Sequence, residues 1–327
     1  MKKNISKILI FVSFSLFFIS GLTNAQSSVA ESNNKKNSLP ILNNHKFVVN
    51  KFVRSPFIKT YIRNTLGVGQ ALDLIVPIME IDGVPVTGLR GDLYFLSIEF
   101  EYQYAVNNWL AVFGNFSVVS RIGNGAQAIL AQGINASYGM ELGWMFKLLK
   151  TKKVMLSATA NIWNKSGTII NIYDFIQNII DEGELLPDNH ILITRNFIQG
   201  GGGLRFAWAA SRFLGVHALT EFAYGESVDK RDKNELFYHV AGSVDSDLNN
   251  IWSVPIGFSL GFEINSFSSG TDNTIDGKVT SIFLRTSYTG RDDFLISIDM
   301  TWAKLPLRQL EQTLNGGTMA INLEYFF

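Results

Sequence analysis

The stretch LYFLSIEFEYQYA, residues 93–105, alternates between apolar and polar side chains. Its apolar set takes every second position and comprises Tyr94, Leu96, Ile98, Phe100, Tyr102 and Tyr104. The positions between them are mostly polar, with Ser97, Glu99, Glu101 and Gln103. A period of two places side chains alternately on the two faces of a β-strand. The stretch therefore predicts a strand with one apolar and one polar face.

Residues 137–149 and 251–265 repeat this alternation. The strands they predict are longer than the ~5–6 residues usual in soluble sheets. Two architectures fit: a soluble sandwich with the apolar faces inside, or a membrane barrel with those faces outside. Aromatic residues near the ends of the apolar faces, with glycine and charge opposite them, favour the barrel. A sheet in hydrocarbon must pair all its backbone groups and therefore has to close on itself.

The N-terminus has the pattern of a secretory signal peptide. Lys2, Lys3 and Lys7 precede an apolar run over residues 8–18, and small residues surround Ala25. The run is too short for a spanning helix, so we expect cleavage after residue 25. Cleavage shifts the formal charge from 0 to −3, which speaks against a nucleic-acid partner.

The composition narrows the possible chemistry. Hydrophobic residues make up 46% of the chain and aromatic residues 13%, yet no apolar run after the leader approaches ~20 residues. The chain has no cysteine, which excludes disulfides, cysteine-linked lipid anchors and cysteine metal sites. The four histidines show no metal-ligand spacing, and the glycine run at 199–206 lacks the Lys-Ser/Thr ending of a phosphate loop. We expect no cofactor, no metal and no enzymatic activity.

The chain ends on NLEYFF, residues 322–327, where Leu323, Tyr325 and Phe327 continue an alternating apolar face to the last residue. With the leader and the alternating segments, this ending resembles bacterial outer-membrane β-barrel proteins. The resemblance implies that Leu323, Tyr325 and Phe327 form an assembly signal for the barrel-assembly machinery, and that outer-membrane lipids surround the protein in a Gram-negative bacterium. The chain is also similar in outline to barrels that take up aromatic compounds and fatty acids.

The expected fold is all-β, a closed antiparallel transmembrane barrel with long extracellular loops. Bacterial barrels have even strand counts, short periplasmic turns and longer outer loops. Residues 235–243 complete an even count, and residues 244–250 become a periplasmic turn. The twelve expected strands are 64–76, 93–105, 108–121, 133–148, 153–163, 196–210, 214–225, 235–243, 251–265, 279–289, 293–303 and 317–327. The expected outer loops are 77–92, 122–132, 164–195, 226–234, 266–278 and 304–316.

Three parts follow from this count: a signal peptide at 1–25, a periplasmic leader or small plug segment at 26–63, and the barrel at 64–327. Parity predicts an ionisable set that lines the lumen. Its members are Glu99, Glu101, Arg121, Glu141, Lys147, Arg205, His217, Glu221, Glu263, Arg285, Asp299 and Glu324. These groups could pair into a structural network or line a selective pathway.

The loop 164–195 carries apolar residues at helical spacing: Ile169, Ile172, Tyr173, Ile176 and Ile179. We expect a helix there, either as a lid over the mouth of the barrel or packed on its rim without a ligand. The sequence as a whole predicts passive passage or uptake of small molecules, with hydrophobic ones among the candidates. The alternative is a structural or adhesive barrel with a blocked lumen that acts through its outer loops.

Overall fold

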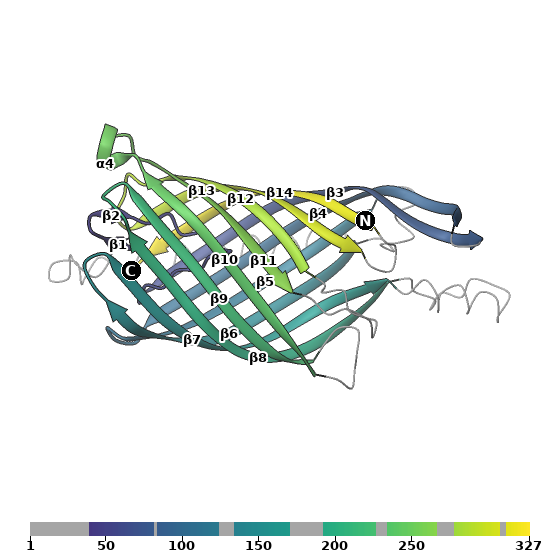
Figure 1. Ribbon diagram of the computed structural model, residues 1–327, viewed down its shortest axis with the longest axis horizontal. Helices are drawn as coiled ribbons and strands as arrows, with labels where there is room; N and C mark the ends of the chain where they lie inside the picture. The colour runs from purple at the N-terminus through teal and green to yellow at the C-terminus, as the bar shows by residue number, and fades with distance from the viewer. Residues whose placement is uncertain are drawn as a thin grey trace, which may run out of the picture. The chain divides into compact units, whose positions relative to one another are not determined.

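The computed structural model describes residues 39–81, 84–123, 134–170, 192–226, 234–266, 278–307 and 312–327. The expected signal peptide and the start of the leader lie outside these ranges. Among the described residues, no helix is long and apolar enough to cross a bilayer. The described chain is almost entirely β-structure (Figure 1).

Twelve strands form a closed barrel in which each strand pairs with its neighbours in sequence and β14 returns to β3. Every pairing around the barrel is antiparallel. The strands are β3 (Tyr61–Ile81), β4 (Val84–Ala105), β5 (Leu110–Gly123), β6 (Ile134–Lys150), β7 (Val154–Ile170), β8 (Leu192–Ala209), β9 (Leu214–Glu226), β10 (Asn234–Asp247), β11 (Ile256–Ser266), β12 (Lys278–Tyr288), β13 (Phe294–Leu307) and β14 (Gln312–Phe326). The predicted twelve-stranded barrel is confirmed.

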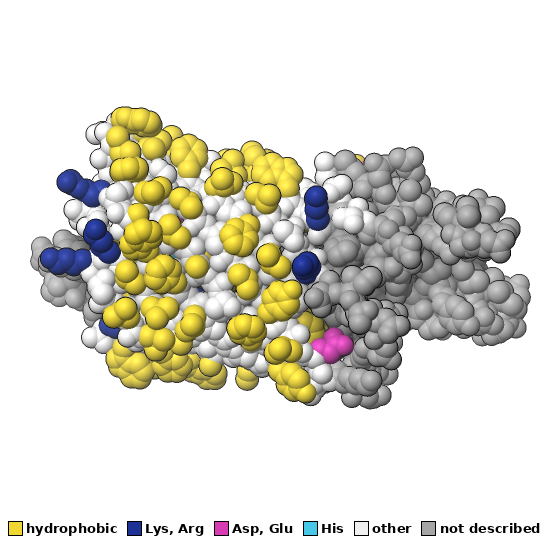
Figure 2. Space-filling model, viewed as in Figure 1, with side chains coloured by type: hydrophobic (Ala, Val, Ile, Leu, Met, Phe, Trp, Pro, Cys, Tyr) yellow, Lys and Arg dark blue, Asp and Glu magenta, His cyan; other side chains and the backbone are white. Residues whose placement is uncertain are grey.

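The apolar faces of these strands point outward. On β4 the exposed side chains are Tyr94, Ile98, Phe100, Tyr102 and Tyr104, and on β6 they are Tyr138, Met140, Leu142, Trp144 and Leu148. Figure 2 shows one face of the wall, where apolar side chains spread over the surface and lysine and arginine lie near the two ends of the apolar area. This wall matches a hydrocarbon environment, where an outward polar side chain would lose its hydration.

One end of the barrel carries short connections, and we call it the turn end. The residues between strands there are 106–109, 151–153, 210–213, 248–255 and 289–293. Exposed aromatic residues stand close to this end, namely Tyr104, Trp109, Trp208 and Tyr288. The six gaps in the described chain all fall at the opposite end, which we call the loop end.

Two of the expected outer loops are wrong because the strands are longer than the pattern indicates. β3 and β4 continue to Ile81 and from Val84, and β13 and β14 continue to Leu307 and from Gln312. Strands β3 and β4 stay paired in this region through register shifts beside Pro77, which breaks the alternation. The prediction of a long loop at 77–92 took no account of the Asp-Gly dipeptide at 82–83, which is a common hairpin signal.

The connection between β10 and β11 also differs from the prediction. Residues up to Asp247 belong to β10, and α4 (Asn249–Trp252) adds a single helical turn. Residues 251–255 therefore do not begin a strand. Ser253 adopts a left-handed conformation with φ of 54°. Pro255 has no N–H to donate to the sheet, so β11 starts after it.

Ile169 lies in β7, opposite Ile193 of β8, so the expected helix cannot begin there. The strand pairing of residues 167–170 with β8 satisfies the backbone groups that a helix would have used. The other lid candidates, Ile172, Tyr173, Ile176 and Ile179, lie outside the described residues.

Candidate functional site in the barrel lumen

Nine members of the expected lumen set are buried on the inner wall: Glu101, Glu141, Arg205, His217, Glu221, Glu263, Arg285, Asp299 and Glu324. Glu99 and Lys147 are half-buried. Arg121 belongs to β5, but its side chain lies outside the described structure. The inner wall therefore carries most of the predicted ionisable side chains in buried positions.

Several of these charges pair across neighbouring strands. Arg285 Nη2 lies 2.7 Å from Asp299 Oδ2, and these two residues are directly opposite in the β12–β13 register. Arg205 Nη2 lies 3.3 Å from Glu221 Oε1. A buried charge is costly unless it is paired and hydrogen-bonded, which explains why these acids and bases pair across neighbouring strands.

Arg63 forms a third pair that the sequence analysis missed. Its guanidinium contacts Glu101, and the Tyr61 hydroxyl donates to the same carboxylate. Arg63 went unnoticed because the expected strand began at residue 64, one position too late. The inward set predicted from Glu101 would have extended to Arg63 if the β3–β4 register had been known.

Two histidines sit among acids on the inner wall. His217 Nδ1 lies 2.9 Å from Asp245 Oδ2. His239 Nε2 lies 3.1 Å from Glu263 Oε1, and its Nδ1 lies 3.6 Å from Glu221 Oε2. Within the described ranges, no group of three or more such side chains has an arrangement that could hold a metal ion.

Residues 39–60, here called the lumen segment, run from the turn end into the barrel: Asn44 and Lys46 contact turn residues, and the residues that follow are mostly buried. The segment includes the short hairpin of β1 (Ile41–Leu42) and β2 (His45–Lys46), followed by residues without regular structure. Its residues Phe47, Val48, Val49 and Val53 are fully or almost fully buried. The apolar cluster around Phe47 includes Met155 and Ala207 of the inner wall. The segment therefore fills part of the lumen.

Wall side chains hydrogen-bond the backbone of the lumen segment from several sides. Gln103 Nε2 donates to the carbonyls of Phe57 and Lys59, at 2.8 Å each. Ser157 Oγ donates to the Pro56 carbonyl at 2.6 Å, and Arg285 donates to the Val49 carbonyl. These donors belong to β4, β7 and β12, so they hold the segment from different parts of the wall. Irregular backbone at membrane depth is tolerated where protein buries and satisfies it in this way.

Two inward glycines make room for the segment. A Cβ at Gly215 of β9 would collide with His45 and would lie 2.6 Å from Phe47 Cε1. A Cβ at Gly257 of β11 would lie 2.5 Å from Val48 Cγ2. Real Cβ atoms do not approach so closely, so the barrel wall is shaped to this segment.

Arg54 links the lumen segment to the charges of the wall. Its Nη1 lies 2.6 Å from Glu141 Oε1, which also accepts a 2.7 Å hydrogen bond from Asn161 Nδ2. Burial disfavours its charge, but the carboxylates of Glu141 and Glu221 hold the pKa of Arg54 well above its usual value. Arg54 is therefore a permanent cation inside the lumen.

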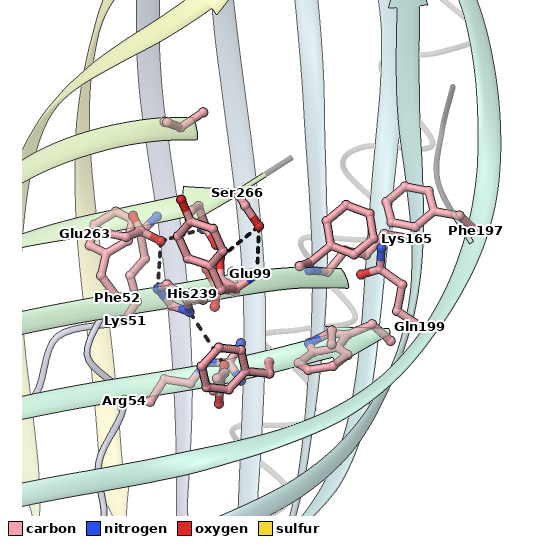
Figure 3. A pocket seen from close by; sticks show the side chains of 18 residues that line it. Lys51, Phe52, Arg54, Glu99, Lys165, Phe197, Gln199, His239, Glu263 and Ser266 are labelled. Carbon is pink, nitrogen blue, oxygen red and sulfur yellow. Dashed lines mark hydrogen bonds and ion pairs between the residues drawn. The ribbon is translucent and has the colours of Figure 1, made fainter. Parts of the chain in front are cut away.

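A cavity of about 520 Å³ lies beside the lumen segment. Lys51, Phe52 and Arg54 contribute to it from the segment, and β4 and β7–β12 contribute wall residues that include Trp163, Gln199 and His239. Figure 3 shows His239 reaching Glu263, with Lys165, Phe197 and Gln199 together on another side of the cavity. Charged and aromatic groups thus surround a space large enough for a small organic molecule.

Known proteins were compared with the chain at the levels of sequence and structure. No protein-family model and no curated protein matches it. The crystal structure of an outer membrane channel from Pseudomonas putida F1 is similar, with a TM-score of 0.55 and 9% identity, over 86% of this chain and 100% of that one.

Two further structures are less similar. The translocator domain of the autotransporter NalP from Neisseria meningitidis has a TM-score of 0.49 and 10% identity, over 82% of this chain and 88% of that one. The P. putida toluene transporter TodX has a TM-score of 0.40 and 10% identity, over 82% and 89% of the two chains. With its closed twelve-stranded antiparallel wall and its apolar exterior, the chain has the fold of the bacterial outer-membrane β-barrel proteins.

Proposed function

We propose that the protein is an outer-membrane channel for small molecules, and that the lumen segment is a plug which must shift for a solute to pass. The cavity beside the segment carries this proposal. It is lined by side chains from seven wall strands and from the segment itself, so a molecule bound there touches both. The outer-membrane channel from P. putida F1 shares the fold, which supports a channel but gives no solute.

The location of the protein is part of the same proposal. Export through a cleaved leader would bring the chain to the outer membrane, where the apolar wall faces lipid. The turn end would then face the periplasm, because short turns lie on that side in bacterial barrels. No catalytic step is required.

A second candidate is a barrel with a permanently blocked lumen that acts through its outer loops. The hydrogen bonds from Gln103, Ser157 and Arg285 to the lumen segment favour this candidate, because each would have to break before the segment could move. Breaking one such bond costs about 1 kcal/mol net when water can replace the lost partner. A few bonds of this size permit rare opening.

Reconstitution separates the two candidates. The purified protein would be placed in planar bilayers and in vesicles, and conductance and uptake of small sugars and neutral aromatic solutes would be measured. A channel gives intermittent conductance or uptake above that of protein-free vesicles. Absence of both conductance and uptake, with a correctly folded barrel, would favour the blocked structural barrel.

A further inference from the structure

Lys165 is a lumen cation for which the described residues provide no ion-pair partner. It lies on β7, its side chain lines the cavity, and its ammonium stands 5.4 Å from the centre of the Trp163 ring. Its direct neighbour on β6 is Gly139, which has no side chain. Lys165 therefore presents its charge toward the cavity.

The acids of the cavity already have partners. Glu221 contacts Arg205 and His239, and Glu263 contacts His239. Glu99 accepts a 2.7 Å hydrogen bond from Asn115 Nδ2. The cavity thus contains engaged carboxylates and an available ammonium, which favours an anionic group on a bound molecule.

Aromatic and amide side chains lie next to Lys165 and Trp163 in the strand register. Phe197 of β8 is directly opposite Lys165, and Gln199 is directly opposite Trp163. Trp163 and Gln199 are each 5% exposed, so both are held firmly in the wall. Figure 3 shows Lys165, Phe197 and Gln199 on one side of the cavity, apart from Lys51, Phe52 and Arg54. A flat apolar body could pack against the rings while its charged end reaches the ammonium.

Resting on the proposed channel function, we propose that Lys165, Trp163, Phe197 and Gln199 form a binding site for a small aromatic carboxylate. The carboxylate pairs with the Lys165 ammonium, and the ring packs against Trp163 and Phe197. A neutral aromatic molecule would gain only the ring contacts, and an aromatic amine would be repelled. The site therefore selects by charge among molecules of the same shape.

Trp163 provides an internal reporter for this site. Of the six tryptophans in the chain, Trp163 alone is buried, while Trp109, Trp144, Trp208, Trp252 and Trp302 are 43–67% exposed on the outside. A nitro-substituted aromatic ligand quenches a tryptophan that it contacts. Trp163→Phe keeps the ring packing and removes the reporter.

The full chain in detergent would be titrated separately with 4-nitrobenzoate, 4-nitrobenzamide and 4-nitrobenzylamine. Binding would be measured by calorimetry and by quenching of tryptophan fluorescence. We expect saturable binding of 4-nitrobenzoate, at least about tenfold tighter than that of the neutral amide, because a hydrogen bond to a charged partner is worth this much. Lys165→Met should lose this preference, and Lys165→Arg should keep it. Quenching should be largely lost in Trp163→Phe while calorimetric binding remains.

Lys51→Met is the matched control, since it removes the same charge from the same cavity at the lumen segment. We expect it to weaken 4-nitrobenzoate binding by less than about threefold, because water screens charges that are not in contact. Equal losses in Lys51→Met and Lys165→Met would overturn the site, as would equal affinity for the three ligands. Binding without uptake by vesicles would leave this site standing and refute the channel, whereas uptake without a preference for carboxylate would refute only the site.

Discussion

At the scale of single residues, the lumen is held together by charges that are buried in pairs. Arg63 and Glu101 show the principle, because they are 1% and 3% exposed and lie opposite each other on β3 and β4. Parity along β4 predicts that Glu101 faces inward, since an outward charge would lie in lipid. The sequence could not predict its partner, because pairing depends on the register between two strands.

Removing one member of this pair should destabilise the barrel strongly. Glu101→Gln leaves the Arg63 guanidinium buried without its carboxylate, which typically costs ~3–5 kcal/mol. The free energy of unfolding, measured by urea titration in detergent, should fall by about this amount. The double variant Arg63→Met/Glu101→Gln should recover much of the loss.

The pair Arg291–Asp293 is the matched control. It joins the same kinds of charge at 2.7 Å, but in an exposed turn at the turn end. Breaking it by Arg291→Gln should cost much less than breaking the buried pair, because water solvates the remaining carboxylate. If Glu101→Gln and Arg291→Gln lowered the free energy of unfolding by similar amounts, burial would not be the reason for the large loss at Glu101.

Phe327 tests whether the C-terminal aromatic residue acts in assembly. Its ring packs edge-on against Tyr325, with centroids 4.8 Å apart, and its N–H donates to the Thr60 carbonyl at 3.0 Å. Phe327→Ala keeps the backbone bond and loses about 2 kcal/mol of burial at most. We expect less assembled protein in cells, together with nearly normal stability after refolding in detergent.

Glu324→Ala changes the inner face of the same strand and should assemble nearly normally. Leu323, which is 41% exposed on the outer face, belongs with Phe327 in the proposed signal for the assembly machinery. Normal assembly of Phe327→Ala at low expression would refute this role. A large loss of stability in detergent would show that the ring is mainly structural.

At the scale of elements, alternation predicted the strands, whereas for residues 26–63 the sequence left a periplasmic leader and a small plug as alternatives. Alternation marks β4 and β6 because one face meets lipid and the other meets the lumen. Residues 39–60 show no such period, since their surroundings are wall residues from distant strands. The fit of His45 against Gly215 cannot be found from either residue alone. Strand ends such as Ile81 were missed because Pro77 interrupts the pattern.

The glycines that face the lumen segment offer a direct test of its fit. Gly215→Val places methyl groups where His45 and Phe47 lie, and overpacking of this kind costs ~1–3 kcal/mol. The lumen segment should therefore leave its packed position in the barrel more often. A single cysteine at buried Val49 would report this as a labelling rate at least about fivefold higher.

Gly200→Val is the corresponding control in an outward position. An added Cβ at Gly200 meets nothing within 4 Å, so neither the wall nor the segment is disturbed. Labelling at Val49→Cys should stay at the wild-type rate in this variant. A similar increase in both variants would mean that labelling reports general loosening of the barrel.

At the scale of the whole molecule, the proposed channel makes the barrel, the lumen segment and the cavity one route. Hydrophobic alternation and strand parity predict the barrel, because closure in lipid leaves few other solutions. They do not predict whether the lumen is open, since this depends on how the lumen segment folds into it. Passage through the proposed channel therefore depends on movement of the lumen segment.

Orientation in the membrane is a prediction at the same scale. The turn end should face the periplasm, so cysteines at Asn107 and Asp292, both in turns, should not react with an impermeant reagent added to intact cells. They should react after the outer membrane is permeabilised, and the native chain contributes no background because it has no cysteine. Labelling of Asn107→Cys on intact cells would show that the turn end faces outward instead.

The most direct test of the account locks the lumen segment to the wall. A Cβ at Gly257 points at Val48, so Val48→Cys/Gly257→Cys brings two thiols within reach of a disulfide. Solute uptake by vesicles would be measured for the reduced protein, after its oxidation, and again after reduction of the oxidised protein. Oxidation should lower uptake by about tenfold or more, because the disulfide holds the lumen segment in the closed position. Reduction should restore uptake. Equal uptake in the oxidised and reduced states would contradict the account, because solutes would then pass without any movement of the segment.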